Sequence, residues 1–315
     1  MVGIVPTSTK VKLKKTKAKT LPPITPNLNI ENRYVKSLDN IVDDYTKIIH
    51  KEVTPIFEDL ISVQKEWNAQ KGNLLKDAFY DSSEPITFYD GIKTIEDYNK
   101  AVAELQEKLE DKVEKLKNRF DMDNPSINKM VSKNISEIDK YTNDSLKANI
   151  EKQYGISRLP QLNTPAMKKV IDDSLEVNVN LIKNVGTEYV DKVSKAVLDN
   201  FSRVGKRDGK SLIDEVYDER EGVTKTRAKT IARDQSAKIT EAFNSERYKA
   251  YGMNQAVWAV ADFTARTRSS HLKLNGDIYD IDKGAKKDDG TYIQPAQEVN
   301  CRCTCRPVVP DGLFD

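Results

Sequence analysis

Three cysteines lie within five residues near the C-terminal end, in the sequence Cys-Arg-Cys-Thr-Cys. Cys301, Cys303 and Cys305 are spaced two apart, so a β-strand would place all three thiols on one face. Thiolates together with a histidine such as His271 are ligands of structural zinc sites. In a strand, however, Cys301 and Cys305 would be about 13 Å apart, whereas zinc needs sulfurs within about 4 Å of each other. A zinc site would therefore use two of the cysteines, His271 and one further ligand.

Two other interpretations of these residues compete with zinc. Small thiols are often buried, so the cysteines could simply pack under a helix, and this is the interpretation that we prefer. Alternatively, a cysteine, His271 and an acid such as Asp262 would supply the parts of a thiol hydrolase. The spacing matches no local signature of such enzymes, and the chain contains no Walker loop, GxGxxG, HExxH or GxSxG motif. We therefore expect neither an enzyme nor a bound cofactor, with zinc as the alternative.

Charged residues precede His271. Asp262 and Arg266 are four apart, so on a helix they would be neighbours, and with Arg268 they would form a salt-bridged cap between a strand and a helix. We expect His271, Cys301 and Cys303 to be structural and to fix the final strand against a helix that begins near Asp262.

The elements around these residues predict a small α+β domain over residues 204–315. Residues 204–209 are rich in turn formers, and a helix is expected over about 224–251, ended by Gly252. Residues 256–261 are short and apolar, which is typical of a buried strand. A turn at Asn275-Gly276 leads to a second short strand at 278–281, and residues 283–299 have the composition of a loop.

Residues 31–203 carry the pattern of an elongated helical region. One apolar stripe recurs at spacings of three and four, which predicts a single amphipathic helix. Its members are Ile95, Tyr98, Val102, Leu105, Leu109, Val113, Leu116 and Phe120. Thr164-Pro165 has the residue types of a helix start, and weaker helical patterns cover 34–71 and 126–153. The fold class expected is therefore mostly α, with a small α+β domain at the end.

Residues 1–30 contain lysines but no acidic residue, and three prolines follow the lysines. Such a segment buries too little apolar surface to offset its ordering entropy, so we expect a flexible arm. The arm could contact the phosphates of double-stranded DNA or an acidic protein surface. The candidate contact residues are Lys10, Lys12, Lys14, Lys15, Lys17 and Lys19.

The composition of the 315 residues excludes several classes of protein. Lys and Arg number 51 against 49 Asp and Glu, a net charge of +2, which excludes a uniformly basic nucleic-acid coat. No window approaches 18 apolar residues, so no membrane span or membrane partner is expected, and the start lacks the apolar core of a secretory signal. An odd number of cysteines argues against a disulfide framework, which indicates synthesis in a reducing cytoplasm.

The order of motifs between Arg227 and Val309 resembles the Mu F-like head morphogenesis (minor capsid) family of tailed bacteriophages. The matching pieces are Ile231-Ala232-Arg233, Trp258, Asp262-x-x-Ala265-Arg266-x-Arg268-x-x-His271, Leu274-Asn275-Gly276, Asn300-Cys301-Arg302-Cys303 and Pro307. Asp234 departs from the usual Thr, and Cys305 adds a thiol to the usual pair. The residues that the resemblance marks as structural are Arg233, Trp258, Asp262, Arg266, Arg268, His271, Gly276, Asn300, Cys301 and Cys303.

This resemblance implies a structural minor head protein, present in few copies, that associates with the phage portal protein during head assembly. It implies a position in the virion, inside the head near the portal vertex, after assembly in the host cytoplasm. Major capsid or scaffold proteins are further candidate partners, and a role in DNA packaging or ejection is implied. The family's Cys and His positions suggest metal binding. A Cys-dependent hydrolase or nuclease-like enzyme and an accessory DNA-binding protein acting through the basic arm are the alternative functions.

Overall fold

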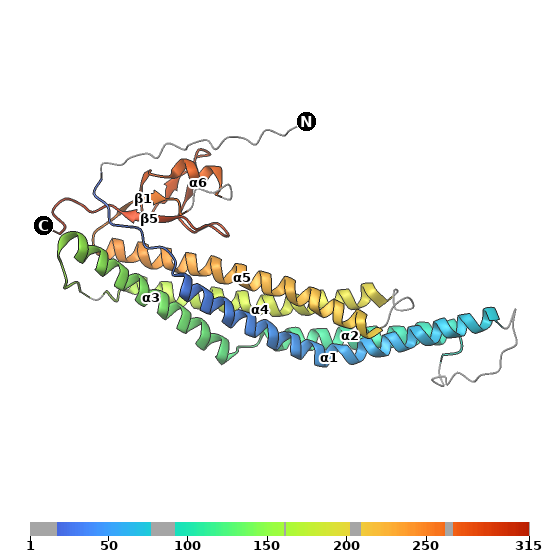
Figure 1. Ribbon diagram of the computed structural model, residues 1–315. Coiled ribbons are helices and arrows are strands. Elements are labelled where there is room, and N and C mark those ends of the chain that lie inside the picture. The colour runs from blue at the N-terminus through green and yellow to red at the C-terminus, as the bar shows by residue number, and fades with distance from the viewer. Residues whose placement is uncertain (1–17, 77–91, 161, 202–208, 262–266, 315) are drawn as a thin grey trace, which may run out of the picture. The chain divides into compact units, whose positions relative to one another are not determined.

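The structure is a computed structural model that describes residues 18–76, 92–160, 162–201, 209–261 and 267–314. Its long helices are α1 (Leu28–Lys76), α2 (Ile95–Asp121), α3 (Pro125–Tyr154), α4 (Pro165–Phe201) and α5 (Gly209–Ala250), and short elements follow them (Figure 1). The predicted fold class is confirmed: the protein is mostly helical, with a small C-terminal region of short antiparallel strands. None of the described helices is long and apolar enough to cross a membrane.

The helix starts follow from local sequence. Thr94 accepts a hydrogen bond from the Asp97 backbone N–H while the Asp97 side chain accepts one from the Thr94 backbone, which forms a capping box before α2. Before α4, the Thr164 hydroxyl accepts a hydrogen bond from the Met167 N–H at 3.2 Å, and Pro165 occupies the first helical position as predicted. Helix α5 begins at Gly209, earlier than the predicted 224.

The chain forms two compact units that are not continuous in sequence. Unit 1 contains residues Met1–Val35, Ser126–Val179 and Thr230–Asp315, and unit 2 contains Lys36–Pro125 and Asn180–Lys229. These units divide the chain differently from the regions 1–30, 31–203 and 204–315 expected from composition. The helices α1, α4 and α5 are long enough to contribute to both units, and composition along the chain cannot show which stretches fold together.

Unit 2 has a core built by helices alone. Its buried side chains are aliphatic and aromatic, and they include Leu105, Leu109, Leu116 and Phe120 of the predicted stripe. Ion pairs lie on the outside of this core, such as Lys112–Glu52 at 2.8 Å. The 3.6-residue period of the sequence therefore reports directly on the buried face of these helices.

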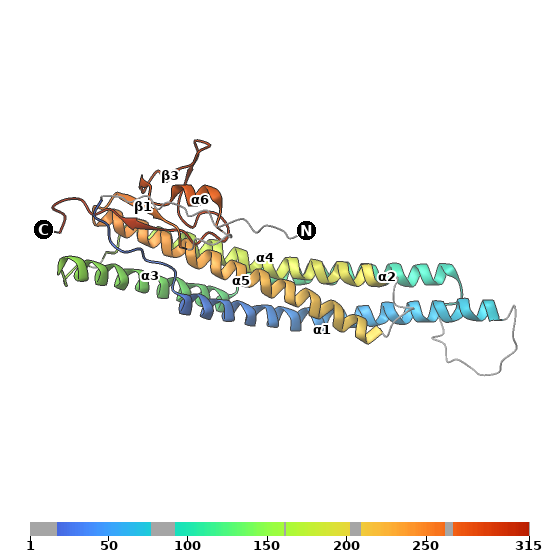
Figure 2. The same cartoon turned by 45° about the horizontal axis from the view of Figure 1, so that its top comes forward.

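Unit 1 combines helices with a small antiparallel sheet. The strands β1 (Gln255–Ala259), β2 (Ile278–Asp280) and β5 (Thr304–Pro307) lie in the order β2-β1-β5. Trp258 of β1 is opposite Cys305 of β5. A second pair, β3 (Ala285–Lys286) and β4 (Tyr292–Ile293), falls in the stretch expected to be loop, because two-residue strands leave no periodic signal (Figure 2).

Residues 18–27, which belong to the expected flexible arm, pack against the rest of unit 1. Leu21 and Ile24 are 1% and 2% exposed. Thr20 forms an isolated antiparallel β-bridge with Val308, directly after β5. Residues 1–17 lie outside the described residues. The expectation that the arm reaches residue 30 is thus wrong for this stretch, because the side chains of Leu21 and Ile24 are buried in the core of unit 1, although the residues between them are exposed.

Candidate metal centre

His271 is held by a short helix and the turn after it. Helix α6 (Ser269–Leu274) carries His271, and Gly276 follows with a φ of +86°, a conformation that favours glycine. The Gly276 N–H donates to the Trp258 carbonyl at 2.9 Å, and the Val260 N–H donates to the Asn275 side chain at 3.0 Å. The predicted Asn-Gly turn therefore fixes α6 against β1. The helix begins at Ser269 and not near Asp262, since Thr267 and Arg268 are not helical.

Cys301 and Cys303 precede the last strand and do not lie in it. The geometry of three thiols on one strand face does not apply, because β5 begins only at Thr304. Asn300 has a φ of +60°, and its N–H donates to Asp234 Oδ1 at 2.9 Å. This anchored bend changes the chain direction just before Cys301, so spacing along a strand does not determine where the thiols lie.

The bend brings two thiols and one imidazole together. Cys301 Sγ lies 3.5 Å and Cys303 Sγ 3.6 Å from His271 Nδ1. The three ligand atoms lie within 4.8 Å of one another. Zinc bonds of about 2.1 Å to nitrogen and 2.3 Å to sulfur, in a tetrahedron, separate the two ligand atoms by about 3.6 Å. The donor types and their spacing therefore fit zinc, with three of its four ligands supplied by described residues.

The other imidazole nitrogen faces a carboxylate that the sequence did not mark. His271 Nε2 lies 3.3 Å from Glu298 Oε2 without making a hydrogen bond to it, and Arg268 Nε lies 2.9 Å from the same oxygen. Metal-binding histidines commonly present their second nitrogen to a carboxylate, which orients the ring. Glu298 is the single charged residue between Asp289 and Arg302 in the sequence, and no motif around it indicates a role.

The surroundings of the two thiols favour one thiolate. A hydrogen bond from the Cys303 thiol is the largest cause that lowers the pKa of Cys301 to about 6, and the backbone N–H groups of Cys303 and Ala296 and the nearby His271 act in the same direction. Burial opposes them. The pKa of Cys303 is raised, first by its hydrogen bond with Cys301 and then by burial. The pair therefore shares one proton, and a cation would favour loss of the second.

The third cysteine is in a different environment. Cys305 is fully buried in β5, and burial raises its pKa well above the ordinary value. Its polar neighbours are Glu241 and Tyr279, not His271. Cys305 is therefore a packing residue, and its substitution can serve as a control for substitution of the other two cysteines.

The same geometry bears on the hydrolase interpretation. Cys301, His271 and Glu298 have the order of nucleophile, base and acid. Cys301 and His271 are, however, only 3% and 1% exposed, and neither lines the 450 Å³ cavity nearby. A substrate would have to reach a sulfur that is covered by protein, so the arrangement suits a structural metal better than a nucleophile.

The other residues that the sequence analysis marked do not supply ligand atoms to this cluster. Arg233 and Arg302 both approach the buried carboxylate of Glu31, at 3.4 Å and 2.5 Å. Trp258 is fully buried, with its ring 5.5 Å from that of His271. Lys19 lies 3.6 Å from Asp311. The others lie outside the described residues: Asp262, Arg266, Lys10, Lys12, Lys14, Lys15 and Lys17.

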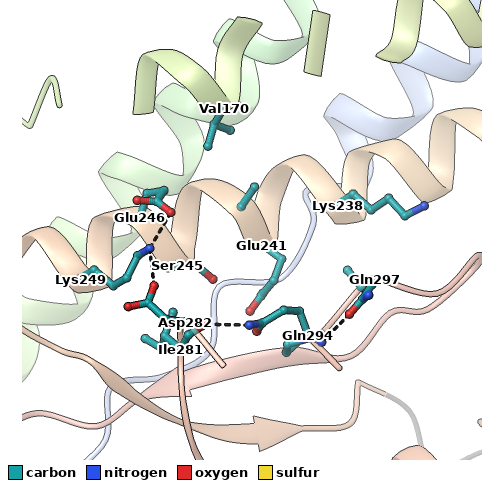
Figure 3. Close-up of a pocket in the computed structure, with 13 residues that line it drawn as sticks. Val170, Lys238, Glu241, Ser245, Glu246, Lys249, Ile281, Asp282, Gln294 and Gln297 are labelled. Carbon is teal, nitrogen blue, oxygen red and sulfur yellow. Dashed lines mark hydrogen bonds and ion pairs between the residues drawn. The ribbon is translucent and has the colours of Figure 1, made fainter. Parts of the chain in front are cut away.

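A cavity of about 450 Å³ lies along α5 in unit 1 (Figure 3). Lys249 closes one end through ion pairs with Glu246 and Asp282, at 2.8 Å and 2.9 Å. Glu241 also lines it, although this carboxyl group is buried. Burial raises the pKa of Glu241 to about 7, and Glu241 Oε2 lies 3.1 Å from the Thr304 hydroxyl oxygen, to which the protonated acid can donate. The residues on either side of Glu241 in the sequence carry no charge, so no charge pattern predicted a buried acid at this position.

Residues 191–306 match the model of the family described as Phage Mu protein F like protein. The resemblance inferred from the motifs is thereby confirmed for this region, and the family is one of phage head morphogenesis. A protein of Haemophilus influenzae strain Rd, described as an uncharacterized protein, is 29% identical over 179 residues. The match covers 56% of this chain but only 38% of that relative. No solved structure matches the chain.

Proposed function

We propose that this protein is a structural minor head protein of a tailed bacteriophage, located inside the head near the portal vertex. The observation that carries the proposal is the Mu F-like match over residues 191–306. The marked motif residues His271, Cys301 and Cys303 converge on one buried cluster, which supports a domain whose motif maintains its fold. The phage portal protein is the proposed partner during assembly, with major capsid or scaffold proteins as further partners.

Co-expression with the portal protein of the same phage tests this assignment. A tagged portal protein should retain the full-length chain through purification, and purified particles should contain few copies per head. The His271→Ala variant is the matched test of whether the cluster is needed for this association. Portal protein that retains none of the wild-type chain, together with particles that lack it, would contradict the proposal.

We also propose that His271, Cys301 and Cys303 hold a structural zinc ion. When bound, zinc would supply cross-linking of the α6 region to the chain before β5, and Glu298 would orient the imidazole. The 3.5 Å and 3.6 Å distances between Nδ1 and the sulfurs support this set of ligands. Metal analysis of protein purified without chelator should find zinc near one equivalent, and its absence would favour simple packing of the thiols.

The lysines at the start of the chain are proposed to contact DNA inside the head. Each neutralised phosphate releases counterions, so affinity should fall steeply with salt. A full-length variant with Lys10, Lys12, Lys14, Lys15 and Lys17 changed to Gln should lose this salt-dependent binding. If the variant and the wild type bind double-stranded DNA equally at low salt, the segment is only a solvated tail.

A further inference from the structure

The segment from Lys19 to Ile24 lies against the rest of unit 1 as a bound peptide would. The Leu21 N–H donates to the Pro307 carbonyl at 3.2 Å, and the Val309 N–H donates to the Lys19 carbonyl at 2.9 Å. These bonds form an isolated antiparallel β-bridge between Thr20 and Val308, directly after β5, which is otherwise an edge of the sheet. Addition of a strand to an open edge is a common mode of peptide recognition.

Side-chain amides contact the rest of this backbone. Asn149 donates to the Pro22 carbonyl at 3.3 Å, and Gln153 donates to the Thr20 carbonyl at 3.5 Å. The Ile24 carbonyl accepts from Asn244 at 3.0 Å. The Thr304 hydroxyl also donates to this carbonyl, at 3.2 Å. We call these contacting residues the docking face: Asn149, Gln153, Asn244, Thr304, Pro307 and Val309.

The segment itself suits recognition through its carbonyl groups. Pro22 and Pro23 have no N–H and a fixed φ, so they present acceptors and lose little entropy on binding. Leu21 and Ile24, on either side of them, are buried in the same core as Leu146 and Tyr248. Two apolar anchors separated by two prolines thus make up the recognised pattern Leu-Pro-Pro-Ile.

We propose that the docking face is a peptide-binding site for an extended segment of the pattern Leu-Pro-Pro-Ile, occupied here by the chain's own residues 18–27. Two backbone hydrogen bonds join the described part of the segment to the strand edge, and the bonds from Asn149 and Gln153 are solvent-exposed, whereas the two bonds to the Ile24 carbonyl are buried. Local opening breaks these few contacts and exposes Leu21 and Ile24, and on this basis it should cost less than unfolding of the whole unit. An equivalent segment supplied in trans can occupy the site when the chain's own segment is displaced.

A fluorescent peptide of residues 18–27 tests the site on full-length protein. Wild type competes with its own tethered segment, so the peptide should bind about tenfold more tightly to the double variant Leu21→Ser/Ile24→Ser. Leu28→Ser is the matched control, because Leu28 is 62% exposed, and it should bind the peptide as weakly as wild type. A peptide with both anchors changed to Ser should bind none of the proteins.

Equal peptide binding by wild type and the double variant, or none by a double variant with wild-type helix content, would overturn the proposal. Hydrogen exchange on wild type provides a second test that needs no variant. The amides of Leu21 and Val309 should exchange faster than that of Phe243, a fully buried residue of α5 in the same unit. Exchange of all three amides at one common rate would mean that the segment leaves only on global unfolding, and would also overturn it.

Discussion

The two compact units are held together by different kinds of interaction. The core of unit 2 consists of aliphatic and aromatic side chains from helices, and its ion pairs are partly exposed. Unit 1 buries charged and titratable groups, among them Glu241, Arg247 and His271. A buried polar group is tolerated only when it has partners, so unit 1 depends on a few specific residues, whereas unit 2 depends on the summed burial of many. Substitutions that target each kind of interaction test this difference.

Loss of a zinc ligand should be the largest effect. Cys303→Ala removes a packed thiol, which costs about 1 kcal/mol, and also the metal, whose binding free energy contributes to folding. Cys305→Ala removes a thiol that is equally buried but lies outside the cluster, so it should cost only the packing. We expect zinc in wild type and Cys305→Ala, none in Cys303→Ala, and a far larger fall in stability for the latter. Two variants with similar stability, and no zinc in any of the three proteins, would show that the cysteines only pack.

Arg247 should have the next largest effect. This side chain is 1% exposed and donates to the Thr142 hydroxyl, the Asp139 carbonyl and the Asp139 carboxylate. Arg247→Met leaves the buried Thr142 hydroxyl and the Asp139 carboxylate, which is 37% exposed, without their donor, and leaving such acceptors unsatisfied costs up to about 3 kcal/mol.

The control for Arg247 comes from unit 2. Lys112→Met breaks the pair with Glu52, whose side chains are 34% and 30% exposed, and should cost at most about 1 kcal/mol. Urea unfolding of both variants gives the two free energies. Comparable losses would remove the distinction between the units.

Glu241 should make the stability of unit 1 depend on pH. Burial raises its pKa from 4.5 to about 7, so folding favours the protonated acid. Its stabilising contribution is present below pH 4.5 and is lost as pH rises through 7, a change of about 3 kcal/mol at about 1.4 kcal/mol per pKa unit. Cys305, Tyr248 and Tyr279 beside it stay neutral in this range, because burial raises the pKa of each.

Glu241→Gln isolates this effect from other groups. The variant keeps a neutral side chain at all pH values. The lowered pKa of Cys301 favours folding at higher pH, but this opposite contribution is the same in both proteins and cancels in the comparison. The stability of the variant relative to wild type should therefore rise between pH 5 and pH 8. A constant difference across this range would mean that Glu241 ionises normally.

Sequence predicted the helices and two strands because their signals are local. The stripe from Ile95 to Phe120 lies within α2, and the Thr164-Pro165 start was correct. The expected strands at 256–261 and 278–281 correspond to β1 and β2 within two residues. Each of these features depends on neighbours within one or two turns, which period and capping rules describe.

The candidate site was only partly predictable, because its contacts join distant residues. His271, Cys301 and Cys303 were identified by type, but their convergence depends on the bend at Asn300 that Asp234 anchors from α5. Glu298 has no distinguishing local signal. The placement of Ile24 depends on Asn244 and Thr304, more than 200 residues away along the chain. Hydrophobic periodicity carries no information on contacts between residues so far apart in the sequence. The prediction for this segment therefore rested on composition alone, which indicated a flexible arm.

The smallest expected effect concerns close packing in unit 2, and it uses two glycines of the same unit. A Cβ at Gly186 of α4 would lie 2.8 Å from the Tyr45 ring and 3.2 Å from Phe120, whereas a Cβ at Gly222 of α5 would meet nothing within 4 Å. Alanine favours a helix over glycine by about 1 kcal/mol at either position. At Gly186, overpacking costs about 1–3 kcal/mol and exceeds this gain, so Gly186→Ala should lower Tm.

Gly222→Ala should raise Tm by a few degrees, because the gain in helix propensity is unopposed. The comparison of these two variants measures how closely the helical core of unit 2 is packed, since the backbone change is the same in both. If both substitutions raise Tm, the ring of Tyr45 moves aside at little cost, and the core of unit 2 adapts to added volume. If both lower Tm, the α5 backbone around Gly222 needs glycine for a reason other than space, and helix propensity does not decide stability there.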